Sequence, residues 1–427
     1  MAKEKEITII KRGKAEFNLV GKAKVSGFTF KTDIESGKEG SDWIYNQMNL
    51  GVECGKEGTI YADLMGGYGS ERENVVYVHG KKKDDSGRNQ DDFENGFKID
   101  WEDRLDEDNF DSIGERCFIT VGLEKDDKDK TVYKKFLTPY DAIQYVSENL
   151  QDGTVINIKG DLKYKLYKDT YSVSKEIRSI ALSNATEDKF KATFTQTIFV
   201  ESDAIGKPDK ETMTIPITGH IIDFVKELNG DKVTRKVKRK EKEGCNLPLV
   251  KVFDVEIAEE KENTMRFLKQ FKTKSKKVTE ITVEGIFTKG SLNTVEVGEE
   301  DIPDDIKELI ELGVIDKDEV IGKMAFANGS KKPERMIIKK PFISMVESNG
   351  NKIPKIAKEA DKYNEDDLNP YLIIEALGGR VIKANDEPVS NDNSEDGEIN
   401  TDDVDVNKLM DEEETEEEGE DDWLKGL

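Results

Sequence analysis

The stretch TPYDAIQYVSENLQDGTVINIKGDLKYKLYKD (Thr138–Asp169) changes its hydrophobic period partway along, and the fold prediction starts from that change. Its first half predicts a short helix, with Thr138 as N-cap, Pro139 in the first turn and Gly153 at the end. Its second half alternates apolar and polar residues, which is typical of a strand. Gly160 in the middle of that strand indicates a bend or a bulge.

A similar helix and strand recur 125 residues later, in NTMRFLKQF and EITVEGIF. The helical apolar positions Met265, Leu268 and Phe271 align without a gap with Tyr140, Ile143 and Val146. The strand positions Ile281, Val283, Gly285 and Phe287 align with Ile156, Ile158, Gly160 and Leu162. Upstream, Cys117–Leu123 also resembles Val252–Ala258. A helix and a strand that match at one offset indicate a duplicated domain.

Further strands are predicted around each copy, and their order indicates the fold. In the first copy they cover 17–30, 43–54, 58–67, 73–80 and 116–123, and strands continue after the helix to Leu182. In the second they cover 190–202, 211–225, 247–258, 280–287 and 334–346. Strands, one helix and closing strands are the element order of an OB-fold, a five-stranded Greek-key barrel. A generic α+β or β-sandwich domain is the alternative.

The predicted fold is therefore mainly β with a few helices: two OB-like barrels and a disordered acidic tail. The expected domains are 1–186, then 187–350 with an inserted helix at Asp301–Gly313, then a linker and short helix at 351–383, and the tail at 384–427. From Ala384 onward the composition is too polar to offset the entropy of ordering.

Charge is unevenly distributed along the 427 residues, whose net charge is −25. The segment Asp386–Leu427 holds 19 acidic and 2 basic residues, so the remaining 385 residues carry only −8. The acidity therefore belongs largely to the tail, and the overall charge says little about what the body binds.

The residues of common catalytic and metal sites are scarce. Three widely spaced cysteines show no disulfide framework or zinc spacing. His79 and His220 are the only histidines, and a structural or exposed role is expected for each. The glycine-rich GGYGSE (Gly66–Glu71) lacks the Lys-Ser/Thr of a phosphate-binding loop. We expect no enzyme activity, no metal and no cofactor. Neither a signal peptide nor a membrane span is apparent, so a cytoplasmic protein is expected.

Basic and aromatic residues that could bind single-stranded DNA cluster in four places, which are Gly80–Lys83, Lys159–Tyr171, Lys232–Lys242 and Lys269–Lys277. Single strands are held by cations on phosphates and by aromatic rings that stack on bases. The candidates are Trp43, Tyr45, Tyr61, Tyr68, Tyr77, Lys81, Lys82, Lys83, Lys163, Lys165, Tyr167, Arg235, Lys236, Lys238, Arg239, Lys240, Lys272 and Lys274. Any one lysine run could equally be a solvated face, and Trp43 and Tyr45 could fill a barrel.

The tail closes with EDDWLKGL (Glu420–Leu427), an acidic run followed by large apolar residues. With the predicted barrels, this arrangement resembles single-stranded DNA-binding proteins of the bacterial and phage type. In that family, OB-folds bind the strand and an acidic tail ends in an apolar tip that docks onto replication and repair enzymes. The resemblance implies a partner-binding tip, formed here by Asp421, Asp422, Trp423, Leu424 and Leu427. The bacterial Ile-Pro-Phe ending and a Gly/Gln/Pro-rich linker are missing, which favours a phage-encoded protein in the host cytoplasm.

The hypothesis is a non-enzymatic, sequence-independent single-stranded DNA-binding protein of replication or recombination. The resemblance implies that its tail recruits a polymerase, primase, helicase or recombinase. The alternatives are a virion or other structural protein with a solubilising tail, and a metal-dependent nuclease hidden among the carboxylates.

Overall fold

The computed structural model describes residues 7–288 apart from 85–86, 168–169 and 211, isolated positions between 292 and 331, and residues 334–383 apart from 349–350. The predicted helix at Asp301–Gly313 falls mostly outside these residues. The acidic tail at 384–427 falls wholly outside them.

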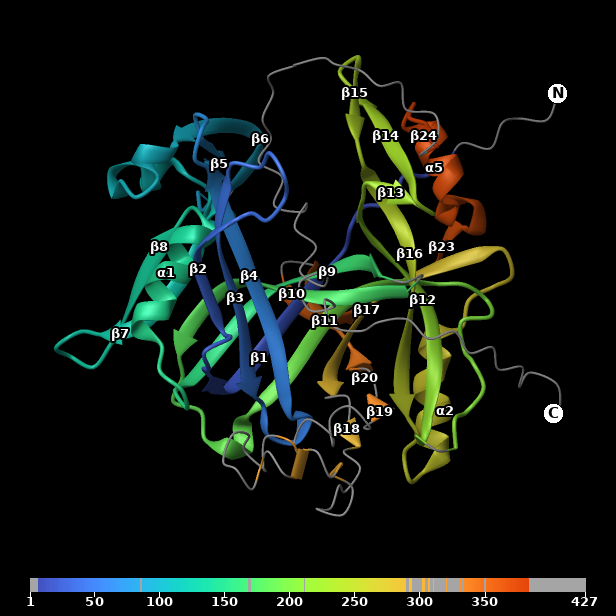
Figure 1. Ribbon diagram of the computed structural model, residues 1–427. Helices are drawn as coiled ribbons and strands as arrows, with labels where there is room; N and C mark the ends of the chain where they lie inside the picture. Colours follow the sequence, from blue (N-terminus) through green and yellow to red (C-terminus); the bar gives the residue numbers. More distant parts are fainter. Residues whose placement is uncertain are drawn as a thin grey trace.

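Five strands of the first half close into a barrel (Figure 1). They are β1 (Ala15–Lys24), β3 (Trp43–Glu53), β4 (Thr59–Gly69), β9 (Val155–Tyr167) and β10 (Thr170–Leu182). Each strand pairs with the next in the order β1-β3-β4-β10-β9, and β9 pairs with β1 again. The β4–β10 pair is parallel and the others are antiparallel. Helix α1 (Pro139–Asn149) precedes β9, and its N-cap Thr138 accepts a hydrogen bond from the Asp141 N–H.

Five strands of the second half close into a barrel in the same way. Its strands are β11 (Lys191–Val200), β12 (Thr214–Val225), β16 (Cys245–Glu256), β17 (Lys277–Thr288) and β20 (Arg335–Pro341), and helix α2 (Lys261–Leu268) precedes β17. The order is β11-β12-β16-β20-β17 and back to β11, again with the third and fifth strands parallel. The predicted fold of two OB-like barrels is confirmed.

The two barrels share one core because their first strands pair with each other. In the antiparallel β1–β11 pair, Phe17 lies opposite Phe194. Phe17 also lies opposite Gly160 of β9, and Phe194 opposite Gly285 of β17. Both phenylalanines are buried in a single hydrophobic cluster that contains residues of both barrels. The glycines aligned in the sequence are therefore equivalent in the structure.

The first barrel carries a large insertion between β4 and α1. It contains the hairpin of β5 (Val75–Lys83) and β6 (Asn89–Asp100), three short turns of helix, and the hairpin of β7 (Ile119–Lys125) and β8 (Thr131–Phe136). Strand β7 pairs in parallel with β10 outside the barrel. The expected match of Cys117–Leu123 with Val252–Ala258 is therefore wrong, because β16 is a barrel strand whose counterpart is β4. Apolar alternation alone does not distinguish the two kinds of strand. Strand β2 (Phe30–Glu35) pairs with the outer edge of β3.

The second barrel carries its main insertion between β12 and β16. Strands β13 (Glu227–Leu228), β14 (Asp231–Val237) and β15 (Lys240–Glu243) project from the barrel, and helix α5 (Pro370–Ala376) and β24 (Val381–Ile382) return to cover them. The hairpins β5–β6 and β14–β15 both point toward the top in Figure 1. Short strands β18 (Leu292–Asn293) and β19 (Ser330–Lys331) lie between β17 and β20.

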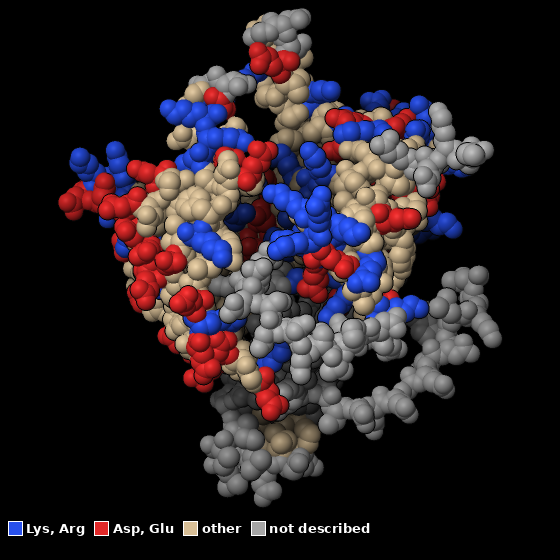
Figure 2. Space-filling model, turned by 90° about the horizontal axis from the view of Figure 1, so that it is seen from above, with Lys and Arg blue, Asp and Glu red and all other residues tan. Residues whose placement is uncertain are grey.

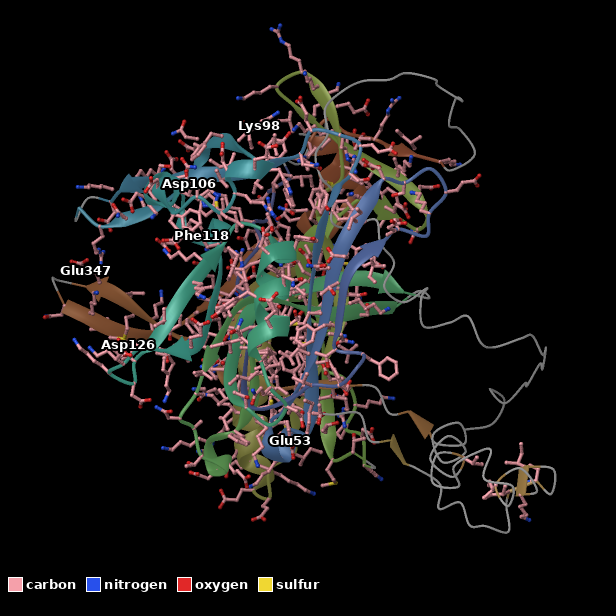
Figure 3. The ribbon with its side chains drawn as sticks, turned by 60° about the vertical axis from the view of Figure 1, so that its left-hand side comes forward. Glu53, Lys98, Asp106, Phe118, Asp126 and Glu347 are labelled. Atoms are coloured by element: carbon pink, nitrogen blue, oxygen red, sulfur yellow. The ribbon has the colours of Figure 1, made fainter. Side chains whose placement is uncertain are left out.

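The segment predicted as a linker contains regular structure. Strands β21 (Ile343–Ser348) and β22 (Asn351–Ile356) form a hairpin, and β23 (Lys358–Asn364) pairs with the edge of β17. The sequence of β23 is mostly charged and gives no hydrophobic period, because this edge strand is held by main-chain hydrogen bonds rather than by burial. Figure 3 shows Glu347 of the β21–β22 hairpin and Asp126 at the β7–β8 tip projecting toward one side. None of the described helices is long and apolar enough to cross a membrane.

Candidate nucleic-acid interface

The outer face of β12 and β16 carries exposed apolar side chains. In the antiparallel register, Thr218 lies opposite Val252, His220 opposite Val250, and Phe224 opposite Asn246. Because side chains alternate between faces along a strand, these residues share one face. The exposed fractions are 42% for Phe224 and 51% for both Val250 and Val252. This apolar face, defined by Phe224, Val250 and Val252, covers the second and third strands of the barrel, where OB-folds contact oligonucleotides.

The β14–β15 hairpin rises from the end of this face. Lys238 and Arg239 form its two-residue turn, with φ angles of 46° and 71°. Two successive positive φ angles are typical of a type I′ turn, which favours Asn-Gly because side chains are disfavoured there. Two long basic residues therefore hold a strained conformation at the most exposed point of the hairpin.

The base of the hairpin is firmly attached. Val233 pairs with Val381 of β24, and Arg380 forms an ion pair with Glu241 at 2.9 Å. Beneath them, Val233, Leu247 and Ile373 are buried in a separate hydrophobic cluster. The tip is thus presented on a fixed support.

The cations of this hairpin are available to a ligand. The guanidinium of Arg235 lies 5.4 Å from the centre of the Phe224 ring, and its Nη1 donates to the carbonyl oxygen of Glu243 at 2.9 Å. Lys236, Lys238, Arg239 and Lys240 are exposed, and none forms an ion pair with another described residue. We call Arg235, Lys236, Lys238, Arg239 and Lys240 the cationic hairpin. Figure 2 looks onto the end from which this hairpin projects and shows Lys and Arg gathered beside a central hollow.

The other predicted cations are mostly neutralised by neighbouring carboxylates. Lys81 pairs with Glu115 at 3.0 Å, and Lys82 with Asp92 at 3.3 Å. Lys163 lies 3.9 Å from Glu176, and Lys274 lies 3.0 Å from Asp361. Lys83 and Lys272 are exposed. The paired lysines of these segments are therefore less available to a phosphate than the exposed cations of the cationic hairpin.

The predicted aromatic residues of the first barrel are dispersed. Tyr45 is only 4% exposed. Its ring is buried inside the protein, so it cannot stack on a base as expected. Tyr61 is exposed and its ring lies over Gly51. Tyr77 is exposed on β5 beneath Lys98. Trp43 is partly buried at the start of β3.

Tyr68 packs in an aromatic cluster beside the N-terminus of α1. Its ring centre lies 5.2 Å from that of Trp101 and 5.4 Å from that of Tyr140. Arg104 covers Trp101 and forms an ion pair with Asp141 at 2.9 Å. The cluster joins the insertion to the barrel. Lys165 and Tyr167 lie in β9, but their side chains, like the tail residues Asp421, Asp422, Trp423, Leu424 and Leu427, are outside the described part of the chain.

His220 contributes no positive charge to the apolar face at neutral pH. Burial lowers the pKa of its imidazole, although Asp203 and a backbone hydrogen bond at Phe199 oppose the shift. Among the described residues, no group of His, Cys, Asp and Glu is arranged to hold a metal ion. The chemistry available on this face is therefore apolar contact and cationic attraction.

Sequence reasoning missed the apolar face. Phe224 stands in the run GHIIDFV, whose hydrophobicity indicates burial, and only the register with β16 shows that it faces outward. The alternation in LPLVKVFDVE does carry a signal, because Val250 and Val252 share one phase of the strand while Leu249 and Phe253 share the other.

Comparison with known proteins identifies the family of the chain. No curated protein matches it. A solved structure with some likeness, a deletion mutant of the single-stranded DNA-binding protein from Thermus aquaticus, has 8% sequence identity and a TM-score of 0.26, covering 65% of this chain and 88% of that one. The model of the YorF family matches residues 23–284, from β1 of the first barrel to β17 of the second. The chain therefore belongs to the YorF family.

Proposed function

We propose that this protein binds single-stranded DNA without sequence specificity, through the apolar face and the cationic hairpin of the second barrel. The observation that carries the proposal is their combination: the exposed Phe224, Val250 and Val252 lie next to five basic residues, four of which are exposed and form no ion pair with a described residue. Bases of any kind can stack on an exposed ring, and cations bind phosphates regardless of sequence. A duplex hides its bases, so the apolar face favours a single strand.

The proposed role is to coat and protect single strands during replication or recombination, without catalysing a reaction. The acidic tail would recruit partner enzymes such as a polymerase, primase, helicase or recombinase through Trp423, Leu424 and Leu427. Large aromatic side chains are strong anchors in protein interfaces, whereas acidic runs alone need no tryptophan.

The test is titration of a fluorescently labelled oligo-dT with the full chain, followed by anisotropy at low and moderate salt, beside a duplex of equal length. We expect tight, salt-sensitive binding that prefers the single strand. Replacing Lys236, Lys238, Arg239 and Lys240 by Gln should weaken binding strongly. The matched control replaces Lys81, Lys82 and Lys83 by Gln; because two of these are already paired with carboxylates, their loss should matter much less. Absence of binding at low salt would remove the proposal.

A second candidate is a structural or interaction protein, such as a virion component. The β21–β22 hairpin favours it, because Ile343 and Met345 are 56% and 60% exposed on one face of a two-stranded ribbon. Exposed apolar patches of this kind mark interaction sites. The same titration separates the candidates, since a purely structural role predicts no preference for single strands.

A further inference from the structure

A cysteine, a histidine and an aspartate meet in the insertion of the first barrel. The Sγ of Cys117 lies 3.2 Å from Nδ1 of His79, and Nε2 of His79 lies 3.3 Å from Oδ1 of Asp91. The three residues come from a short helical turn (Glu115–Cys117), from β5 and from β6. Each belongs to a different element, so the contact exists only because the insertion folds.

The geometry assigns a distinct role to each ring nitrogen. A neutral imidazole has one donor and one acceptor nitrogen. The Cys117 Sγ lies 3.7 Å from Nε2 as well as 3.2 Å from Nδ1, so with Nε2 donating to the Asp91 carboxylate, Nδ1 is the nearer nitrogen and the one left as an acceptor. A carboxylate that fixes the tautomer of a histidine, which in turn faces a nucleophile, is the arrangement that activates serine and cysteine nucleophiles.

The surrounding chain holds the imidazole in place. The ring of Phe93 lies 4.5 Å from that of His79, and the Arg116 N–H donates to Asp91 Oδ1 at 3.3 Å. A Cβ on Gly114 would lie 2.4 Å from Asp91 Oδ1 and 2.5 Å from Cδ2 of His79. Only glycine therefore lets the backbone close against the pair.

The other two thiols lack this setting. Cys54 and Cys245 are 0% and 1% exposed, and burial raises their pKa to about 12 and about 11. Burial also raises the pKa of Cys117, with Arg178 and Asp91 acting in opposite directions, but Cys117 is only partly buried. Of the three thiols, Cys117 alone lies within hydrogen-bond distance of an imidazole that can accept its proton.

We propose that Cys117 is a reactive thiol that exchanges with small disulfides, with His79 as its proton acceptor and Asp91 as a positioning residue. His79 Nδ1 takes the thiol proton, and the thiolate attacks one sulfur of the disulfide. A new S–S bond forms at Cys117 as the original S–S bond breaks, and the departing thiolate receives the proton from His79. No net oxidation occurs, because one disulfide replaces another.

A cavity lies next to the helical turn that carries Cys117, although Cys117, His79 and Asp91 do not themselves line it. Glu115, Arg116 and Phe118, which flank Cys117 in the chain, line this cavity of ≈ 490 Å³ against the outer side of β1, β9 and β11. Phe118 is labelled in Figure 3, at the junction between the insertion and the barrel. A cavity of this size holds a small organic molecule.

The test uses the reduced full chain and dithiobis-nitrobenzoate, an aromatic disulfide whose exchange releases a coloured thiol. We expect one fast-reacting thiol, which mass spectrometry of the digested protein assigns to Cys117, while Cys54 and Cys245 react only after unfolding. Cys117→Ser should abolish the fast phase. His79→Gln should slow it by about 100-fold, the low side of what a positioned base contributes. Asp91→Asn should slow it less.

A second readout covers the case in which the His79 variant fails to fold. In the unaltered protein, Cys117 should exchange faster in the folded chain than in urea, because only folding places His79 against the thiol. The charged groups that face the pair are Asp91 on β6, Arg178 on β10, and Glu115 and Arg116 on the helical turn. A Cys117 that exchanges no faster in the folded chain than in urea, or no faster than the two buried thiols, would overturn the proposal.

Discussion

Gly160 and Gly285 are the two single residues that leave room for Phe17 and Phe194 where the barrels meet. A Cβ on Gly160 would lie 1.8 Å from the Glu176 carbonyl oxygen and 2.6 Å from Phe17, and a Cβ on Gly285 would lie 2.2 Å from the Ile337 carbonyl oxygen. Backbone atoms cannot move aside cheaply. We expect Gly160→Ala and Gly285→Ala each to lower the free energy of unfolding by about 1–3 kcal/mol. Urea denaturation measures this, with Gly37→Ala as control, since its Cβ meets nothing within 4 Å. Equal stability of all three variants would refute the packing argument.

Phe224 is the residue of the apolar face best suited to stack on a base. Losing one base–aromatic contact costs about 1–3 kcal/mol in single-strand binding. Phe224→Ala should therefore raise the dissociation constant for oligo-dT roughly 5- to 150-fold, with little change in salt dependence. Tyr133→Ala is the control, because Tyr133 is 59% exposed on β8, outside the apolar face. Similar losses in both variants would mean that the face is not the binding surface.

His220 makes stability depend on pH. Its pKa is lowered in the folded protein by burial, so below about pH 6.5 the unfolded chain binds the proton more readily. Stability from this group is therefore present above about pH 6.5 and is lost as the pH falls toward the folded pKa. The nearby Glu201 has its pKa raised by burial and opposes this trend at lower pH. Thermal unfolding should show a smaller loss between about pH 7.5 and 5.5 in His220→Gln than in the unaltered protein. Identical pH profiles would contradict the assignment.

The β14–β15 hairpin shows, at the scale of an element, a conflict between stability and charge. Lys238 and Arg239 hold left-handed conformations that cost about 1–2 kcal/mol each for residues with side chains. Lys238→Asn with Arg239→Gly should stabilise the protein while removing two cations. Single-strand affinity should fall, and the slope of log affinity against log salt should become shallower by about 1.4 if both contact phosphates. Thermal unfolding and anisotropy measure the two effects. Gain of stability without loss of affinity would show that the turn does not contact DNA.

The helices and strands were largely predictable from the sequence, whereas the pairings between them were not. Thr138 and Pro139 start α1 through local interactions, and the period change after Gly153 follows from the residues of that stretch alone. The exposure of Phe224 depends on β16, more than twenty residues away in the chain, and the neutralisation of Lys82 depends on Asp92 across a hairpin. Reactive or binding surfaces of this kind follow from pairings between elements, which a single sequence does not display.

At the scale of the whole molecule, the acidic segment is expected to compete with DNA for the cationic hairpin. Removing Asp411–Leu427 should tighten oligo-dT binding at low salt and matter little at high salt, where the attraction is screened. Trp423→Ala with Leu424→Ala is the matched control: it keeps every acidic charge, so it should leave DNA affinity unchanged while abolishing partner recruitment. Unchanged or weaker DNA binding after truncation would argue against competition.

The pairing of β1 with β11 gives the molecule a direction-reversing symmetry. Equivalent strands run antiparallel with the equivalent residues Phe17 and Phe194 opposite each other, so a local two-fold axis passes between them. Because of this axis, equivalent strands on the outer faces of the two barrels run in opposite directions. A nucleic-acid strand has a chemical direction, and a straight strand would meet the second barrel in the reverse sense to the first. If the single-strand binding proposed for the second barrel extended to the first, the two barrels would require strands of opposite direction, or one strand that doubles back.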